Sequence, residues 1–194
     1  MTVDMPSCYN INMTTKASLL WIDLEMTGLD PVKDRIIEVG VIATDWDFNE
    51  IARFESAVKV DDKLVKKRLT GDFWEKNANA RDGLLKQNSG ATKSAEEVEN
   101  ELLKFLDDNF DLTQPIYLAG NSIHQDQKFI EREWPRLNKK LHYRQLDVTA
   151  WKIIFENRGV IFAKPEVHRA MSDIEGSIAE LKYYLKKINF EKGK

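Results

Sequence analysis

Three short apolar stretches, separated by turn residues, occupy the first third of the chain. They are Ser18–Met26 (SLLWIDLEM), Arg35–Trp46 (RIIEVGVIATDW) and Ile51–Val60. Each has the length and the β-branched and aromatic content that are typical of a strand. Because the connections between them are short, we predict that the three strands form an antiparallel meander.

After Val60 the apolar positions recur at helical spacing. Asp61–Leu69 is predicted to form a short helix, and the capping-box pattern Ser94-Ala-Glu-Glu predicts the start of a longer one. The apolar residues that fall on one face of the longer helix are Val98, Leu102, Phe105 and Leu106. The intervening segment Ala80–Ala91 contains two glycines and an asparagine, and it is predicted to be a loop.

The rest of the chain alternates strands with helices. The predicted elements are a buried strand at Pro115–Ala119, a helix at Gln125–Trp134 that Pro135 ends, a strand at Tyr143–Leu146, a helix at Val148–Phe155 and a final helix at Met171–Ile188. Hairpin strands followed by this alternation give an α/β fold, a mixed sheet flanked by helices.

Composition and charge limit the class of protein. The 194 residues suit one domain with a substantial core, and no apolar run approaches the ~20 residues of a membrane helix, so we expect no membrane partner. The single cysteine, Cys8, excludes an internal disulfide and fits a reducing compartment. The net charge of −3 disfavours an extended surface that binds nucleic acid without regard to sequence. It is compatible with a short substrate that binds at an acidic metal site.

Residues 1–17 are predicted to be a flexible arm that precedes a single domain at residues 18–194. The arm contains no arginine, one lysine and one acid, whereas a mitochondrial presequence is rich in arginine and poor in acids. We therefore expect a cytoplasmic protein, with a mitochondrial location as the alternative.

The first candidate for chemistry is the pair Asp23 and Glu25. Residues two apart in a strand share a face, so these two carboxylates lie side by side. Inside a sheet they repel each other, and one pKa rises unless a cation lies between them. The alternative is a charged edge strand that faces solvent, and the pair alone does not decide between these interpretations.

Asp126, His168 and Asp173 are the remaining candidates. Asp126 opens a helix on the side of its apolar residues, where it either points into a site or simply favours the helix dipole. Asp173 follows His168 by five positions, which would place them about 140° apart on one helix, so we expect His168 on the loop before the final helix. The small residues Gly176 and Ser177 would let that helix approach the sheet. The alternative is a surface aspartate beside a loop histidine.

Taken together, the four acids indicate a cage for two cations. Carboxylate oxygens suit Mg²⁺ or Mn²⁺, and two such ions about 4 Å apart clamp the oxygens of an in-line phosphoryl displacement. A neutral histidine on a nearby loop can take a proton from the attacking water near neutral pH.

The chain resembles the oligoribonucleases, a family of DEDDh exonucleases in the ribonuclease H-like superfamily. The motifs that carry the resemblance are WIDLEMTGLDPVKDRIIEVG (Trp21–Gly40), GNSIHQD (Gly120–Asp126), HYRQLDV (His142–Val148) and HRAMSDI (His168–Ile174). The resemblance implies a mixed five-stranded sheet, Asp23, Glu25, Asp126 and Asp173 as the ligands of two divalent cations, and His168 as the general base. It also implies cleavage from the 3′ end of RNAs of two to five nucleotides, release of 5′-mononucleotides, and a homodimer.

The resemblance also implies contacts to the substrate. These are Leu29 as a wedge between two bases, Trp74 as a stacking aromatic, Ser122, Arg144 and Thr149 as a cap on the 5′ phosphate, and Tyr143 as a residue that reaches in from the partner subunit. Without the resemblance, loop burial explains Leu29, and strand-edge packing explains Tyr143 and Arg144.

The chain departs from the family pattern at Asn79, where the family has a histidine five residues after the tryptophan. This departure leaves the strictness of the dinucleotide preference open. The competing functions are a DEDDh exonuclease that trims longer RNA or DNA, and an inactive RNA-binding module, which the presence of all four acids and the histidine disfavours.

Overall fold

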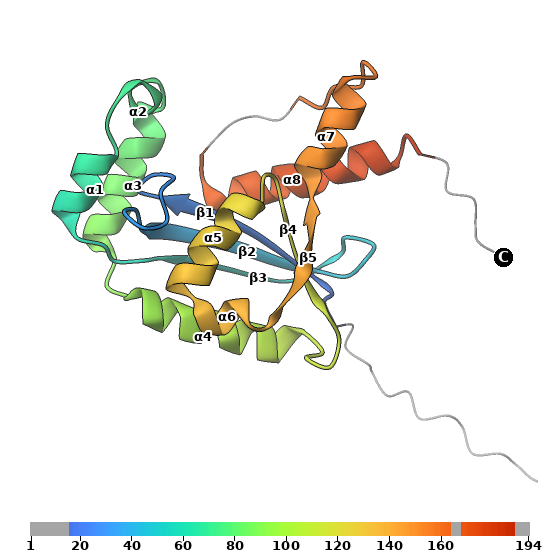
Figure 1. The fold of residues 1–194 in the computed structure, drawn as a ribbon, viewed down its shortest axis with the longest axis horizontal. Helices are drawn as coiled ribbons and strands as arrows, with labels where there is room; N and C mark the ends of the chain where they lie inside the picture. Colours follow the sequence, from blue (N-terminus) through green and yellow to red (C-terminus); the bar gives the residue numbers. More distant parts are fainter. Residues whose placement is uncertain (1–15, 164–167, 189–194) are drawn as a thin grey trace, which may run out of the picture.

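Five strands form one mixed sheet in the computed structural model, which describes residues 16–163 and 168–188 (Figure 1). The strands are β1 (Leu19–Met26), β2 (Ile36–Thr44), β3 (Glu50–Ala57), β4 (Ile116–Gly120) and β5 (Leu141–Asp147). Their order is β3-β2-β1-β4-β5, with β1–β2 and β2–β3 antiparallel and β1–β4 and β4–β5 parallel. The predicted meander and mixed sheet are confirmed. Because β1 is central, the interpretation of Asp23 and Glu25 as part of an edge strand is wrong.

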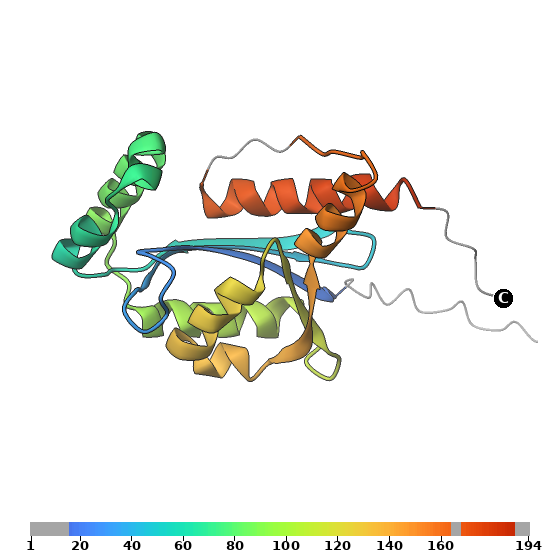
Figure 2. The ribbon, with the colours of Figure 1, turned by 45° about the horizontal axis from the view of Figure 1, so that its top comes forward.

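Helices cover both faces of the sheet. They are α1 (Asp62–Arg68), α2 (Asp72–Lys76), α3 (Ala78–Gly90), α4 (Ala95–Asn109), α5 (His124–Glu133), α6 (Pro135–Asn138), α7 (Val148–Glu156) and α8 (Ala170–Leu185). Figure 2 shows α8 on one face, α4, α5 and α6 on the other, and α1 to α3 grouped at one end. Within the described ranges, no helix is long and apolar enough to cross a membrane.

The helix α3 replaces the loop predicted at Ala80–Ala91. Leu84 is buried against α1 and β2, and the side chain of Asn88 donates to the Val60 carbonyl at 3.0 Å and to the Asp62 carboxylate at 2.7 Å. These tertiary contacts offset the low helix propensity of the glycines and asparagines, which had predicted a loop.

Other boundaries follow the sequence more closely. Ser94 caps α4 in a capping box with Glu97, as predicted. The break at Pro135 is also present, although Pro135 then begins the short helix α6. The final helix ends at Leu185 rather than Ile188. Of the predicted N-terminal arm, residues 1–15 lie outside the described residues, whereas Ala17 is buried and bridges to Phe110.

The alternation of side chains along β1 separates two cores. Ile22 and Leu24 pack on the side of α4 and α5, whereas Leu19 and Trp21 pack on the side of α8. Asp23 and Glu25 lie on the same face as Leu19 and Trp21, nearer the carboxyl end of the strand. The face of β1 toward α8 is therefore apolar in its first half and acidic in its second half.

Candidate metal and catalytic site

Three carboxylates meet where β1 ends beneath the first turn of α8. The ligand oxygens of Asp23, Glu25 and Asp173 all lie within 4.8 Å of one another. The approach of α8 depends on Gly40, which pairs with Asp23 in the β1–β2 register, because a Cβ on Gly40 would lie 3.0 Å from the backbone of Ala170. The small residue Ser177, predicted to allow a close approach, is buried and its hydroxyl accepts a hydrogen bond at 2.9 Å from the side chain of Asn121, which follows β4.

The electrostatics of this group favour a bound cation. Burial, and after it the neighbouring carboxylates of Glu38, Asp173 and Asp126, raise the pKa of Glu25 to about 8, although the Arg169 guanidinium acts in the opposite direction. Such a group holds a proton at neutral pH unless a positive ion replaces that proton. Three converging carboxylates are also the hard oxygen ligands that divalent cations such as Mg²⁺ or Mn²⁺ accept, so these residues fit a metal site.

Asp126 lies next to this group without being one of its three members. It is the third residue of α5 and 7% exposed, and its Oδ1 accepts a hydrogen bond from the Leu24 backbone N–H at 3.0 Å. Burial raises its pKa to about 7, although the backbone hydrogen bonds act in the opposite direction. Burial therefore outweighs any stabilisation of its charge by the helix end, which argues against the simple helix-dipole explanation.

His168 lies on the segment before α8, as its spacing from Asp173 predicts. It lines a cavity of about 600 Å³ together with Asp23 and Asp173. Its backbone has φ +52°, a left-handed conformation that is uncommon for a non-glycine residue. Its ring lies 5.2 Å from the Phe73 ring, edge to face at 69°.

Glu38 and Arg169 were not predicted, yet they fix the segment that carries His168. Glu38 pairs with Glu25 across the β1–β2 register and is 6% exposed. It accepts hydrogen bonds from the Arg169 Nε at 3.2 Å and from the Ala170 N–H at 3.2 Å. The Arg169 N–H also donates to Asp173 Oδ2 at 3.2 Å. One acid within the apolar run IIEVGVIAT was the available signal for Glu38.

Ser122 and Thr149 are brought together in the same cavity as His168. The Ser122 N–H donates to Thr149 Oγ1 at 2.8 Å and to Asp147 Oδ1 at 3.1 Å, and the two hydroxyls are 3.2 Å apart. Lys152, which was not predicted, lines this cavity one helical turn after Thr149. Arg144 lies elsewhere, on β5, with its guanidinium 5.3 Å from the ring of Tyr143, which is 74% exposed.

A second cavity, of about 420 Å³, lies on the other side of the acids. Its lining includes Glu25, Leu29, Phe73 and Trp74. Leu29 is 73% exposed, so loop burial does not explain it. Trp74 is half-buried, since part of it packs against the α1–α3 core. The acids therefore lie between a cavity that contains Ser122 and one that contains Leu29.

A buried aspartate holds the Leu29 loop in place. Asp34 is fully buried and accepts hydrogen bonds from the Asp30 N–H at 3.0 Å and from the Thr27 hydroxyl at 3.0 Å. The guanidinium of Arg68 on α1 completes the site with two bonds of 2.6 Å. Asn79 lies exposed on α3.

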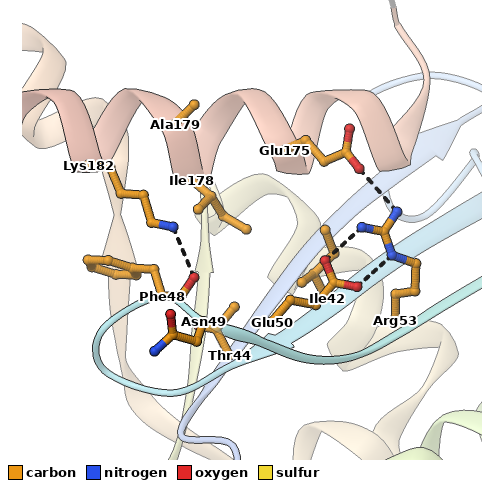
Figure 3. Close-up of a pocket in the computed structure, with 10 residues that line it drawn as sticks. All are labelled: Ile42, Thr44, Phe48, Asn49, Glu50, Arg53, Glu175, Ile178, Ala179 and Lys182. Carbon is orange, nitrogen blue, oxygen red and sulfur yellow. Dashed lines mark hydrogen bonds and ion pairs between the residues drawn. The ribbon is translucent and has the colours of Figure 1, made fainter.

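A further groove lies between α8 and the β2–β3 hairpin, away from the acids (Figure 3). Its charged groups are already paired. Arg53 binds Glu50 and Glu175, and Lys182 donates to the Phe48 carbonyl at 3.0 Å (Figure 3). The cavities on either side of the three acids are therefore the better candidates for the reaction site.

The mixed sheet, with acids on its central strand and on the helix above it, defines a ribonuclease H-like exonuclease fold. A family model described as "Exonuclease" matches residues 20–181. Among solved structures, E. coli exonuclease I in complex with single-stranded DNA superimposes with a TM-score of 0.63 at 14% identity over 89% of this chain and 41% of that one. Exonuclease I from Methylocaldum szegediense gives 0.60 at 16% identity over 88% of this chain and 40% of that one. At these identities the likeness concerns the fold.

Relatives of higher sequence identity show which family of exonucleases the chain belongs to. The oligoribonuclease of Francisella tularensis subsp. novicida is 37% identical over 179 residues, which cover 91% of this chain and 98% of the relative. The oligoribonuclease of Chromobacterium violaceum is 39% identical over 172 residues, which cover 86% and 93%. The chain belongs to the oligoribonuclease family of exonucleases.

Proposed function

We propose that this protein is a 3′→5′ exoribonuclease that hydrolyses short RNA, dinucleotides in particular, to 5′-mononucleotides. The observation that carries the proposal is the group of three carboxylates within 4.8 Å, placed between a cavity with two hydroxyls and a cavity with an exposed leucine and a tryptophan. A scissile phosphate at the acids would have a nucleotide on each side, and the two cavities match that division.

The metal ligands in this proposal are Asp23, Glu25, Asp173 and Asp126, and the ions are Mg²⁺ or Mn²⁺. Two such ions, when bound, supply the positive charge that stabilises both the attacking and the leaving oxygen. Asp126 has one carboxylate oxygen engaged by the Leu24 N–H, which fixes its orientation against β1.

The protein's own residues move the proton and orient the substrate. His168 accepts a proton from the attacking water at an imidazole nitrogen, which its place on the wall of the cavity that Asp23 and Asp173 also line allows. Leu29 and Trp74 contact the bases, and the Ser122 and Thr149 hydroxyls bind the 5′ phosphate, with the Lys152 ammonium lining the same cavity. A phosphate held there would mark the 5′ end of the substrate and favour short RNA.

We also propose that the protein acts as a homodimer. Large apolar side chains are exposed on β5 and α7, namely Tyr143 at 74%, Ile153 at 57% and Ile154 at 50%. Large hydrophobic side chains that gather on one exposed surface mark protein contacts. The partner's Tyr143 would then reach the 5′ end of the substrate, and Arg144 beside it would add charge. Sedimentation analysis tests this, and a monomer at working concentration would contradict it.

Substrate length tests the proposed function directly. We would follow mononucleotide release from 5′-phosphorylated RNAs of two to ten nucleotides with Mg²⁺, using His168→Gln as an inactive control. We expect the dinucleotide to be cleaved fastest. Rates that do not fall with length would favour an exonuclease that trims longer RNA, and an absence of cleavage at every length would reject the enzyme.

A further inference from the structure

Phe73 is an aromatic residue of α2 that contacts the candidate general base on one side and the candidate base-stacking residue on the other. Its ring centroid lies 5.2 Å from that of His168 and 5.0 Å from that of Trp74, with interplanar angles of 69° and 82°. Edge-to-face packing is a preferred geometry for aromatic pairs and resists reorientation of either ring. Phe73 is 53% exposed and lines the cavity that contains Leu29 and Trp74.

His168 needs such support because its backbone is not part of a regular element. It has φ +52° and precedes α8, and the bonds from Arg169 and Ala170 to Glu38 hold the main chain on its C-terminal side. These bonds locate the residue but do not set the orientation of its imidazole. The Phe73 ring contacts that imidazole directly, from an element that lies far away in sequence.

We propose that Phe73 is a positioning residue that orients the His168 imidazole and couples it to occupancy of the base cavity. The proposal rests on the proposed exoribonuclease function. A nucleobase that binds beside Leu29 and Trp74 occupies the cavity that Phe73 also lines. The ring of Phe73 packs on the His168 imidazole as well. Base binding therefore holds the general base in its working orientation, so a substrate that fills this cavity is hydrolysed faster than one that does not.

The kinetic test compares Phe73→Leu, which keeps an apolar side chain without a ring, with Phe73→Tyr, which keeps the ring. On a 5′-phosphorylated dinucleotide with Mg²⁺, we expect kcat of the leucine variant to fall roughly ten- to a hundredfold, the range for a misplaced catalytic group. The tyrosine variant should restore most of kcat. Trp46→Leu is the matched control, because Trp46 is 59% exposed and contacts Tyr117 at 5.5 Å, and it should leave kcat unchanged.

A spectroscopic measurement separates positioning from a general loss of structure. The chain has three histidines, so the imidazole proton signals of His168 can be assigned by comparison with His168→Gln. In the metal-free protein, Phe73→Leu should shift the His168 signals and leave those of His124 and His142 in place. Addition of a dinucleotide with Ca²⁺ should shift the His168 signals in the wild-type protein, and much less in the leucine variant.

The outcomes are distinct. Unchanged His168 signals and an unchanged kcat in Phe73→Leu would overturn the proposal, as would a rise in KM with kcat intact, which would assign Phe73 to base binding alone. If the wild-type protein cleaved no RNA, the proposed function would fail, while the signal shift in the metal-free protein would still decide whether Phe73 orients His168.

Discussion

The Oδ1 atom of Asp126 accepts a hydrogen bond from the backbone N–H of Leu24 at 3.0 Å. Leu24 is the residue between Asp23 and Glu25, so this bond ties the start of α5 to the strand that carries both acids. An aspartate that served only the helix dipole would be better placed in solvent, where its charge is hydrated. Its burial suggests that the charge is balanced by bound cations in the working enzyme.

The substitution Asp126→Asn separates activity from stability. The amide oxygen can still accept the Leu24 N–H, but it carries no charge. We expect hydrolysis to fall by roughly a hundredfold or more, the scale of losing one group that stabilises charge in a transition state. The measurement is single-turnover cleavage of a dinucleotide at saturating Mg²⁺. Activity within a few fold of wild type would remove Asp126 from the ligand set.

The same variant should be more stable than wild type at pH 8 without metal. The pKa of Asp126 is raised from 3.8 to about 7. The protonated carboxyl therefore contributes its full stabilisation below about pH 4, and this stabilisation is lost as the pH rises through 7. At about 1.4 kcal/mol per pKa unit, the buried charge costs a few kcal/mol at pH 8. Thermal unfolding with chelator should show a Tm several degrees higher for the asparagine variant, and the difference should shrink toward pH 4. A lower Tm at pH 8 would contradict this sign.

Metal binding should release a proton near neutral pH. The pKa of Glu25 is raised to about 8, so the metal-free carboxyl is mostly protonated at pH 7 and must ionise to bind a cation. Below pH 8 we expect the apparent Mn²⁺ affinity to fall about tenfold per pH unit for this one proton. Calorimetry in two buffers of different ionisation enthalpy measures the release. Glu25→Gln should reduce it to the smaller release from Asp126, whose pKa is raised to about 7, and equal heats in both buffers for the wild-type protein would rule it out.

The ion pair between Glu38 and Arg169 should matter for both stability and rate. Arg169→Met leaves the Glu38 side chain, which is 8% exposed, without its cation. Breaking a buried pair costs 3–5 kcal/mol, and since the Arg169 side chain is 42% exposed we expect about 2 kcal/mol. We also expect kcat to fall roughly tenfold or more, because the residue after His168 loses its anchor.

Denaturant unfolding and dinucleotide kinetics measure these two effects. Arg53→Met is the matched control, since Arg53 and Glu50 are both partly exposed, at 48% and 39%, and such pairs contribute under about 1 kcal/mol. Equal losses of stability in the two variants would show that Glu38 is not an electrostatic anchor.

Patterns along single elements predicted much of this molecule. The period of two along β1 placed Asp23 and Glu25 on one face, and the spacing of His168 from Asp173 placed the histidine before α8. Both inferences needed only the local geometry of one strand or helix. The family motifs supplied Ser122 and Thr149, whose contact joins β4 to the start of α7.

The parts that sequence could not predict depend on contacts between distant segments. The hydrogen bond from Arg169 to Glu38 joins residues that are 131 positions apart, and no periodic pattern around either residue identifies the other. The role proposed for Phe73 likewise follows only from the contact of its ring with the ring of His168. The helix α3 was missed because buried Leu84 and the hydrogen bonds of Asn88 stabilise it against its own composition.

Gly40→Ala tests whether the close approach of α8 to the sheet assembles the acids. A Cβ there would lie 3.0 Å from the Ala170 backbone and from the N atom of Met171, so the start of α8 must move away from Asp23, the strand partner of Gly40. Overpacking of this kind costs about 1–3 kcal/mol, and the displaced Asp173 should weaken Mn²⁺ binding. Gly90→Ala is the control, because nothing lies within 4 Å of its added Cβ. Thermal unfolding and Mn²⁺ titration of both variants measure the effect. If Gly40→Ala lost stability but bound Mn²⁺ like the wild-type protein, the position of Asp173 would not depend on this contact.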